Sequence, residues 1–151
     1  MKNALQLIAI MGLLIITCSS CKKTTYPAPQ NVNISGSWVE PPTQILSRKL
    51  EFGGTGVFKN YITIKDNNNT ELTIYTGSYQ LNGDKLTVSV TEKLYQRNTE
   101  PAVKTAVNFS LFEQCTYTVN ERVLVLNYIS YPADAPVATK MTLLRETMSI
   151  D

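Results

Sequence analysis

The chain has 151 residues, three cysteines, no histidine and a formal net charge of +2, with 17% charged residues. This length fits one domain of ordinary size. The absence of histidine excludes Ser-His-Asp and Cys-His catalytic pairs and zinc sites that need imidazole, and the near-neutral charge argues against nucleic-acid binding and against disorder.

The first 20 residues have the pattern of a secretion signal. Lys2 precedes an apolar run, Ala4–Ile16, which is interrupted by Gln6 and Gly12. This run has the length of the apolar part of a signal peptide, whereas a membrane-spanning helix needs about 20 apolar residues. We therefore expect residues 1–20 to be a signal peptide.

The end of this leader, Thr17-Cys18-Ser19-Ser20-Cys21, resembles the lipobox of bacterial lipoproteins. In those proteins small residues precede a cysteine that becomes the acylated first residue of the mature chain. Cys21 follows two serines, and we predict it as the lipid-attachment site. Cys18 is the alternative attachment site. A further alternative is an ordinary secretion signal with no lipid attached to the mature chain. Two or three acyl chains, palmitate among them, would hold the protein on a bilayer. The lipid bilayer is therefore an expected binding partner.

The residues that follow Cys21 predict a tether and a location. Residues 21–33 contain prolines and lack apolar periodicity, which is typical of an extended linker. The cysteine is followed by lysines rather than aspartate, which favours the outer membrane, on either its periplasmic side or the cell surface. With Cys21 acylated and Cys18 removed, Cys115 is the remaining thiol, and no internal disulfide is expected.

From Ile34 onward the sequence predicts strands. Threonine, valine, tyrosine and isoleucine dominate, and no ten-residue stretch repeats its apolar residues with a helical period. The expected strands lie at 35–40, 45–52, 55–65, 70–81, 84–94, 106–119, 122–131 and 137–146. Asn82-Gly83 is the strongest hairpin signal between them. Eight short strands with local turns favour an up-and-down antiparallel barrel, which has no exposed edge; a β-sandwich is the alternative.

Two segments bear on a possible binding site. In 106–119 the odd positions are mostly apolar, and regular alternation would direct Glu113 into the barrel with Phe109, Leu111 and Tyr117. Glu113 would then be a polar anchor for a ligand, unless a β-bulge at Phe112–Glu113 turns it outward. Lys93–Thr105 is expected to be the longest connection, either a solvated loop or a segment that gates a barrel mouth or contacts a partner.

Gly36-Ser37-Trp38 at the start of the first strand matches the Gly-x-Trp motif of lipocalins, and Arg145 ends the last strand. Residues 34–147 resemble the small lipocalin-like domains of bacterial lipoproteins. The resemblance implies that Trp38 closes the floor of an eight-stranded barrel and that Arg145 packs over its ring. The chain departs from typical lipocalins because it lacks their Thr-Asp-Tyr motif and has too few residues after Arg145 for their C-terminal helix.

These patterns together predict a membrane-anchored lipoprotein that binds a small apolar ligand in its barrel. The candidate lining residues are Phe109, Leu111, Glu113 and Tyr117. A barrel filled with side chains, serving as a structural or protein-interaction module of the cell envelope, is the alternative. We expect no catalytic activity, cofactor, metal site or nucleic-acid partner, and we expect Cys115 to be a small buried residue rather than a nucleophile.

Overall fold

A computed structural model describes residues 33–132 and 135–146. The predicted signal peptide, both candidate lipid-attachment cysteines and residues 21–32 of the tether lie outside the described residues. The described strands are β1 (Gly36–Val39), β2 (Leu46–Phe52), β3 (Val57–Asp66), β4 (Asn69–Asn82), β5 (Lys85–Arg97), β6 (Val103–Ser110), β7 (Glu113–Val119), β8 (Val123–Ser130) and β9 (Val137–Arg145).

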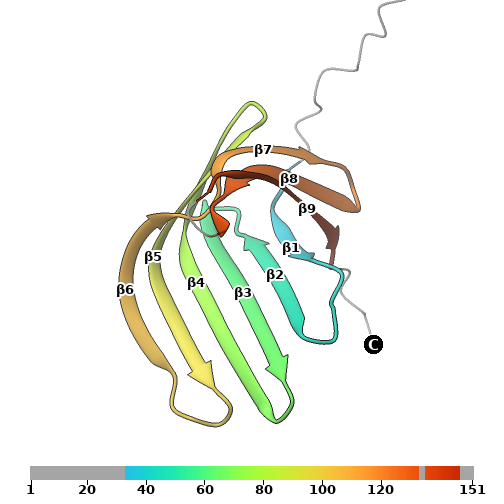
Figure 1. The fold of residues 1–151 in the computed structure, drawn as a ribbon. Helices are drawn as coiled ribbons and strands as arrows, with labels where there is room; N and C mark the ends of the chain where they lie inside the picture. The colour runs from blue at the N-terminus through green and yellow to red at the C-terminus, as the bar shows by residue number, and fades with distance from the viewer. Residues whose placement is uncertain (1–32, 133–134, 147–151) are drawn as a thin grey trace, which may run out of the picture. The chain divides into compact units, whose positions relative to one another are not determined.

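The strands close into the predicted up-and-down antiparallel barrel. The order within the sheet is β4-β3-β2-β1-β9-β8-β7-β5-β6, and β4 also pairs with β5. Eight strands therefore form a ring, in which β1 joins β2 on one side and β9 on the other (Figure 1). The strand β6 is an addition to the ring that pairs with β5 alone among the described strands.

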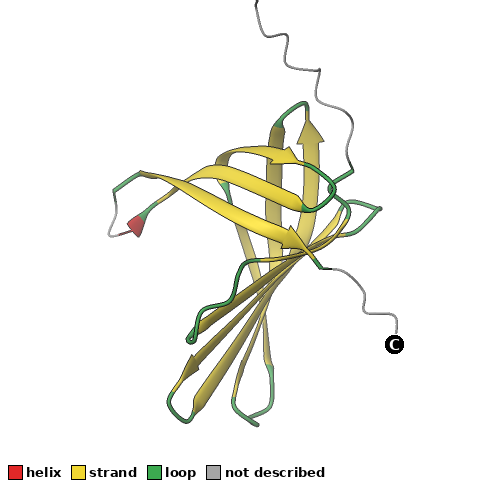
Figure 2. Ribbon diagram, turned by 90° about the vertical axis from the view of Figure 1, so that its right-hand side faces the viewer, coloured by secondary structure: helices red, strands yellow, loops and turns green. Residues whose placement is uncertain are grey.

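The strands of the ring differ in length, and the longer ones extend beyond it. Within the described ladders β5 pairs with β7 at one position, Lys85 with Thr116, whereas it pairs with β4 along nearly its whole length. The distal parts of β3, β4 and β5, together with β6, form a curved sheet that β7, β8 and β9 do not cover (Figures 1 and 2). We call this part the open sheet, and its side that continues the ring interior the inner face.

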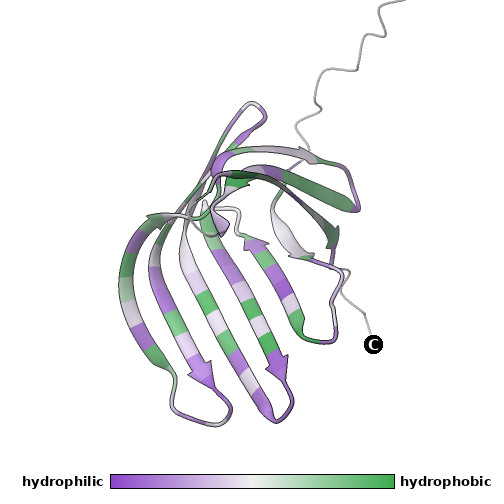
Figure 3. Ribbon diagram, viewed as in Figure 1, coloured by the Kyte–Doolittle hydropathy of each residue, from purple (hydrophilic) through white to green (hydrophobic). Residues whose placement is uncertain are grey.

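The core fills the interior of the ring. Leu86, Val88 and Val90 alternate with exposed residues along β5, as expected for a strand with one buried face. Figure 3 shows the same alternation of apolar and polar residues along the neighbouring strands. The largest fully buried side chains are Trp38, Phe52, Phe58, Ile34, Leu50, Leu124, Leu126, Leu143, Val88 and Val90.

Turn residues account for several of the connections. Gly83 has a φ of +63°, which the Asn82-Gly83 hairpin requires. The side chain of Asn120 accepts hydrogen bonds from the backbone N–H groups of Arg122 (2.9 Å) and Val123 (2.7 Å), and this fixes the turn into β8.

Two predicted boundaries are wrong. The expected loop Lys93–Thr105 is mostly strand, because β5 continues to Arg97 and Tyr95 pairs with Val103 of β6. Residues with high strand propensity thus continue the ladder, and a short turn remains between the two strands. The expected strand 106–119 is divided into β6 and β7 by a bend at Leu111-Phe112.

Candidate functional site

One end of the ring is sealed by Trp38 and Arg145. The two residues are paired across β1 and β9, and the guanidinium carbon of Arg145 lies 4.2 Å from the centroid of the Trp38 ring. The Trp38 indole N–H donates a 2.7 Å hydrogen bond to the Ile34 carbonyl oxygen. This satisfies the polar atom of a fully buried side chain, so the contact stabilises the floor of the barrel.

The guanidinium of Arg145 also binds backbone carbonyls. Its Nε donates to the Glu121 oxygen at 2.9 Å, and its Nη1 donates to the Ser35 oxygen at 3.1 Å. Gly36 has a φ of +124°, and a Cβ at this position would lie 3.0 Å from Nη1. The Gly36, Trp38 and Arg145 triad of the sequence motif therefore lies together at a closed end of the ring, where it holds the chain termini of the barrel to one another.

Of the two orientations considered for Glu113, the structure shows the one that a β-bulge produces, so Glu113 does not point into the barrel. Gln114 takes a φ of +49°, and the β7–β8 register shifts between Glu113 and Thr116. The shift turns Phe112 inward, where it is 5% exposed, and places Glu113 outside the barrel. The Glu113 carboxylate accepts a 2.9 Å hydrogen bond from the Tyr131 hydroxyl, and this bond raises the pKa of Tyr131. A bulge adds one residue to a strand and so reverses the alternation beyond it.

The four candidate lining residues do not form one site. Phe109 lies on the inner face of the open sheet, where its ring contacts Tyr75 edge-on with a centroid distance of 5.5 Å. Leu111 and Tyr117 pack against the core of the ring. Glu113 alone borders the largest cavity described below.

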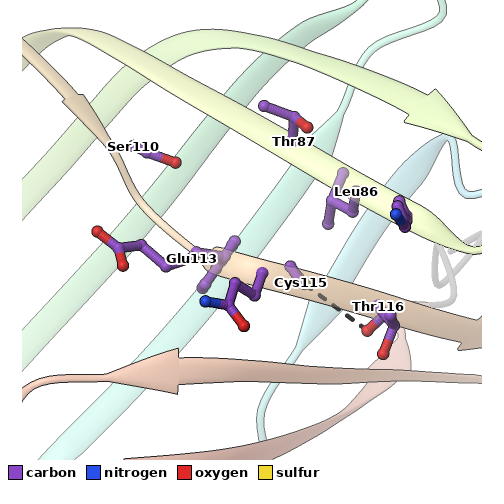
Figure 4. Close-up of a pocket in the computed structure, with 9 residues that line it drawn as sticks. Leu86, Thr87, Ser110, Glu113, Cys115 and Thr116 are labelled. Carbon is purple, nitrogen blue, oxygen red and sulfur yellow. Dashed lines mark hydrogen bonds between the residues drawn. The ribbon is translucent and has the colours of Figure 1, made fainter. Parts of the chain in front are cut away.

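A side opening in the barrel wall lies between β5 and β7. The strands diverge from the single pair Lys85–Thr116, and a half-open cavity of about 600 Å³ results (Figure 4). Its apolar lining comes from Leu86, Phe112 and Cys115, which belong to the core of the ring. The polar lining residues are Lys85, Thr87, Ser110, Glu113, Gln114 and Thr116. Phe112 is the apolar residue that breaks the alternation of its segment, which indicates a bulge there but not the opening.

The thiol in this opening is unreactive at neutral pH. Burial raises the pKa of Cys115 to about 11, so the neutral thiol is the stable form. Its Sγ lies 3.7 Å from the Thr116 carbonyl oxygen, which is compatible with a weak S–H donor (Figure 4). The thiol therefore contributes apolar surface to the opening and no nucleophile.

We expect alkylation of Cys115 by iodoacetamide to be slow in the folded protein. At pH 8.5 the thiolate fraction should be on the order of a hundredfold lower than in the urea-unfolded chain, because the folded pKa is about two units higher. The native rate should keep rising until the pH reaches about 11. Mass spectrometry of the peptide that contains Cys115 measures both rates; equal rates at pH 8.5 would contradict a raised pKa.

Two buried polar side-chain atoms lack a hydrogen-bond partner among the described residues. They are Asn60 Oδ1 on β3 and Arg48 Nε on β2, and Asn60 is 3% exposed. The Arg48 guanidinium is otherwise paired, because its Nη1 lies 3.2 Å from the Glu40 carboxylate. Asn60 lies on the same buried face of β3 as Phe58, two residues before it, so the alternation of buried and exposed residues along the strand accounts for its burial.

Comparison of the chain with models of known families, with curated proteins and with solved structures finds no match. In the part of the chain that the structure describes, no helix is long and apolar enough to cross a bilayer. Within residues 33–132 and 135–146, no three histidine, cysteine, aspartate or glutamate side chains are grouped to hold a metal ion. Functional inference therefore depends on the geometry of the chain itself.

Proposed function

We propose that the protein is a lipid-anchored component of the bacterial cell envelope that binds a small, largely apolar molecule in the side opening between β5 and β7. The observation that carries this proposal is the opening itself. Its volume of about 600 Å³ lies in the range of small-molecule sites. Leu86, Phe112 and Cys115 would contact the apolar part of the ligand, and the polar rim would orient it.

The ring interior is a poorer location for the ligand than the opening. Trp38, Phe52 and Phe58 are fully buried there and occupy the volume that an open lipocalin-like calyx would offer. A ligand in the opening would contact the same core from the side. The ammonium of Lys85 and the carboxylate of Glu113 both border the opening. Lys85 could bind a negatively charged end of a ligand, and Glu113 a positively charged end.

A pair of matched variants tests the site. Ser110 borders the opening, and Ser110→Phe should fill part of it, whereas Ser78→Phe adds the same ring at an exposed position on β4. We expect the wild-type protein to bind the fluorescent probe anilinonaphthalene sulfonate saturably, and Ser110→Phe to weaken binding at least about tenfold. Equal binding by Ser110→Phe and Ser78→Phe, or no binding by the wild type, would overturn the proposal.

The ligand class follows from native mass spectrometry of the protein purified from its own host. A retained small molecule that is lost from Ser110→Phe would identify the chemical class. An empty protein that also binds no probe would favour the second candidate function, an interaction module of the envelope. That candidate is supported by the filled ring and by the exposed apolar residues Val103 and Phe109 on β6.

The lipid anchor is supported by the apolar leader and the two cysteines that follow it. We propose that acyl chains on Cys21 hold the protein in the outer membrane. Labelling with radioactive palmitate should be lost in Cys21→Ser and kept in Cys18→Ser. The reverse result would assign the anchor to Cys18, and a wild-type protein that takes up no label would remove the anchor from the proposal.

A further inference from the structure

The strand β6 presents a free edge. It stands at the end of the strand order and pairs with β5 on one side only. Seven of its eight residues are exposed, Val107 being the exception. The backbone N–H and C=O groups along the other side have no strand partner among the described residues, and such an edge readily accepts another strand.

The β5–β6 ladder has one irregularity, between the pairs Val90–Phe109 and Glu92–Ala106. Apart from it, the edge carries few of the features that usually prevent strand addition. Val103–Ser110 contains no proline or glycine, and its single charge is Lys104. The Lys104 ammonium lies 2.6 Å from the Glu92 carboxylate on β5, so this cation is occupied within its own chain. On the inner face Val103 and Phe109 remain 59% and 39% exposed, so this edge offers apolar surface that a partner can cover.

We propose that two copies of the chain pair through β6, antiparallel and about a two-fold axis at Ala106. A continuous sheet requires inner-face residues to lie opposite inner-face residues. With Ala106 opposite the partner's Ala106, Val103 faces the partner's Phe109, and Thr105 faces the partner's Val107. The two exposed apolar residues of each copy are then covered by those of the other.

The alternative registers are less favourable. Centring the axis on Val107 leaves Val103 without an opposite residue and places Phe109 against the partner's Thr105. The register centred on Ala106 also sets Lys104 opposite the partner's Asn108, so no two ammonium groups meet across the seam. Because the pairing uses the same edge of both copies, it closes at a dimer. This self-complementarity favours a second copy over an unrelated strand.

Cysteine cross-linking in native membranes tests the register. Ala106 and Asn108 are both exposed on β6. Across the proposed seam the cysteine of Ala106→Cys lies opposite the same cysteine of the second copy. The cysteine of Asn108→Cys lies opposite Lys104 of the second copy. Mild oxidation should therefore convert Ala106→Cys into a disulfide-linked dimer and leave Asn108→Cys and the wild type monomeric on a non-reducing gel. Failure of Ala106→Cys to cross-link, or equal cross-linking of Asn108→Cys, would overturn the register.

Sedimentation of the full chain in detergent tests the association itself. We expect Val103→Lys to weaken the dimer at least about tenfold, because it places a charge against the partner's Phe109. Val137→Lys, at an exposed position on β9, should leave the dimer unchanged. A monomeric wild type would overturn the proposal. A different protein that copurifies with the monomeric wild type, but not with Val103→Lys, would also overturn it, because β6 would then pair with that protein and not with a second copy. Neither variant lines the opening, so probe binding should persist in both.

Discussion

Replacing Trp38 with alanine is expected to lower the free energy of unfolding by about 3–5 kcal/mol. The indole is fully buried at the floor of the ring and bonds the Ile34 carbonyl oxygen. Its removal leaves a cavity and deprives the Arg145 guanidinium of the ring that it covers. Since a domain is stable by only about 5–15 kcal/mol, the loss is a large fraction of the total.

Urea unfolding followed by far-ultraviolet circular dichroism measures this loss. Fluorescence is unsuitable because Trp38 is the one tryptophan of the chain. Trp38→Phe should recover part of the stability, since it keeps a ring in the cavity. Leu144→Ala, at an exposed neighbour on β9, should change the free energy by less than about 1 kcal/mol. If the two alanine variants unfold at the same urea concentration, Trp38 does not hold the floor.

Gly77→Ala is the second substitution with a large expected effect. A Cβ at Gly77 would lie 1.9 Å from the Ser89 carbonyl oxygen and 2.8 Å from the Val90 Cα. These are backbone atoms of β5, which cannot rotate away as a side chain would. The β4–β5 ladder, whose register shifts at this point, would have to separate. We expect a loss of about 3 kcal/mol or more in the free energy of unfolding.

Gly54→Ala is the matched control for this substitution. A Cβ at Gly54 meets no atom within 4 Å, so the same added methyl group should change stability by no more than about 0.5 kcal/mol. Thermal unfolding of both variants by circular dichroism distinguishes them. Similar midpoints for Gly77→Ala and the wild type would show that β5 accommodates the methyl group, contrary to the close approach described here.

The fold was predictable because its main determinants are local. The alternation of Leu86, Val88 and Val90 with polar residues defines a strand with one buried face, and Asn82-Gly83 defines the turn before it. Each of these patterns depends on neighbours within a few residues. The antiparallel connections followed from such patterns, and they favoured an eight-stranded barrel. The ninth strand did not follow, because the bend at Leu111-Phe112 divides the predicted strand 106–119 into β6 and β7.

The side opening was not predictable because it depends on distant residues. Phe112 turns inward and Glu113 outward at the bulge, where Gln114 takes a positive φ and the register with β8 shifts. Regular alternation within the segment predicted the opposite orientation, and a bulge at Phe112–Glu113 was the alternative that the structure shows. The separation of β5 from β7 likewise depends on how far each strand extends past the single pair Lys85–Thr116. No local pattern encodes that divergence.

The closure of the ring between β1 and β9 has a kinetic consequence. Ser35 and Arg145, which are joined by a hydrogen bond, are 110 residues apart in the sequence. Closing so long a loop lowers the entropy of the chain before the contact between Trp38 and Arg145 stabilises it, which favours slow folding. A nascent chain that lacks β9 cannot cover Trp38, so folding to completion must await synthesis of Arg145.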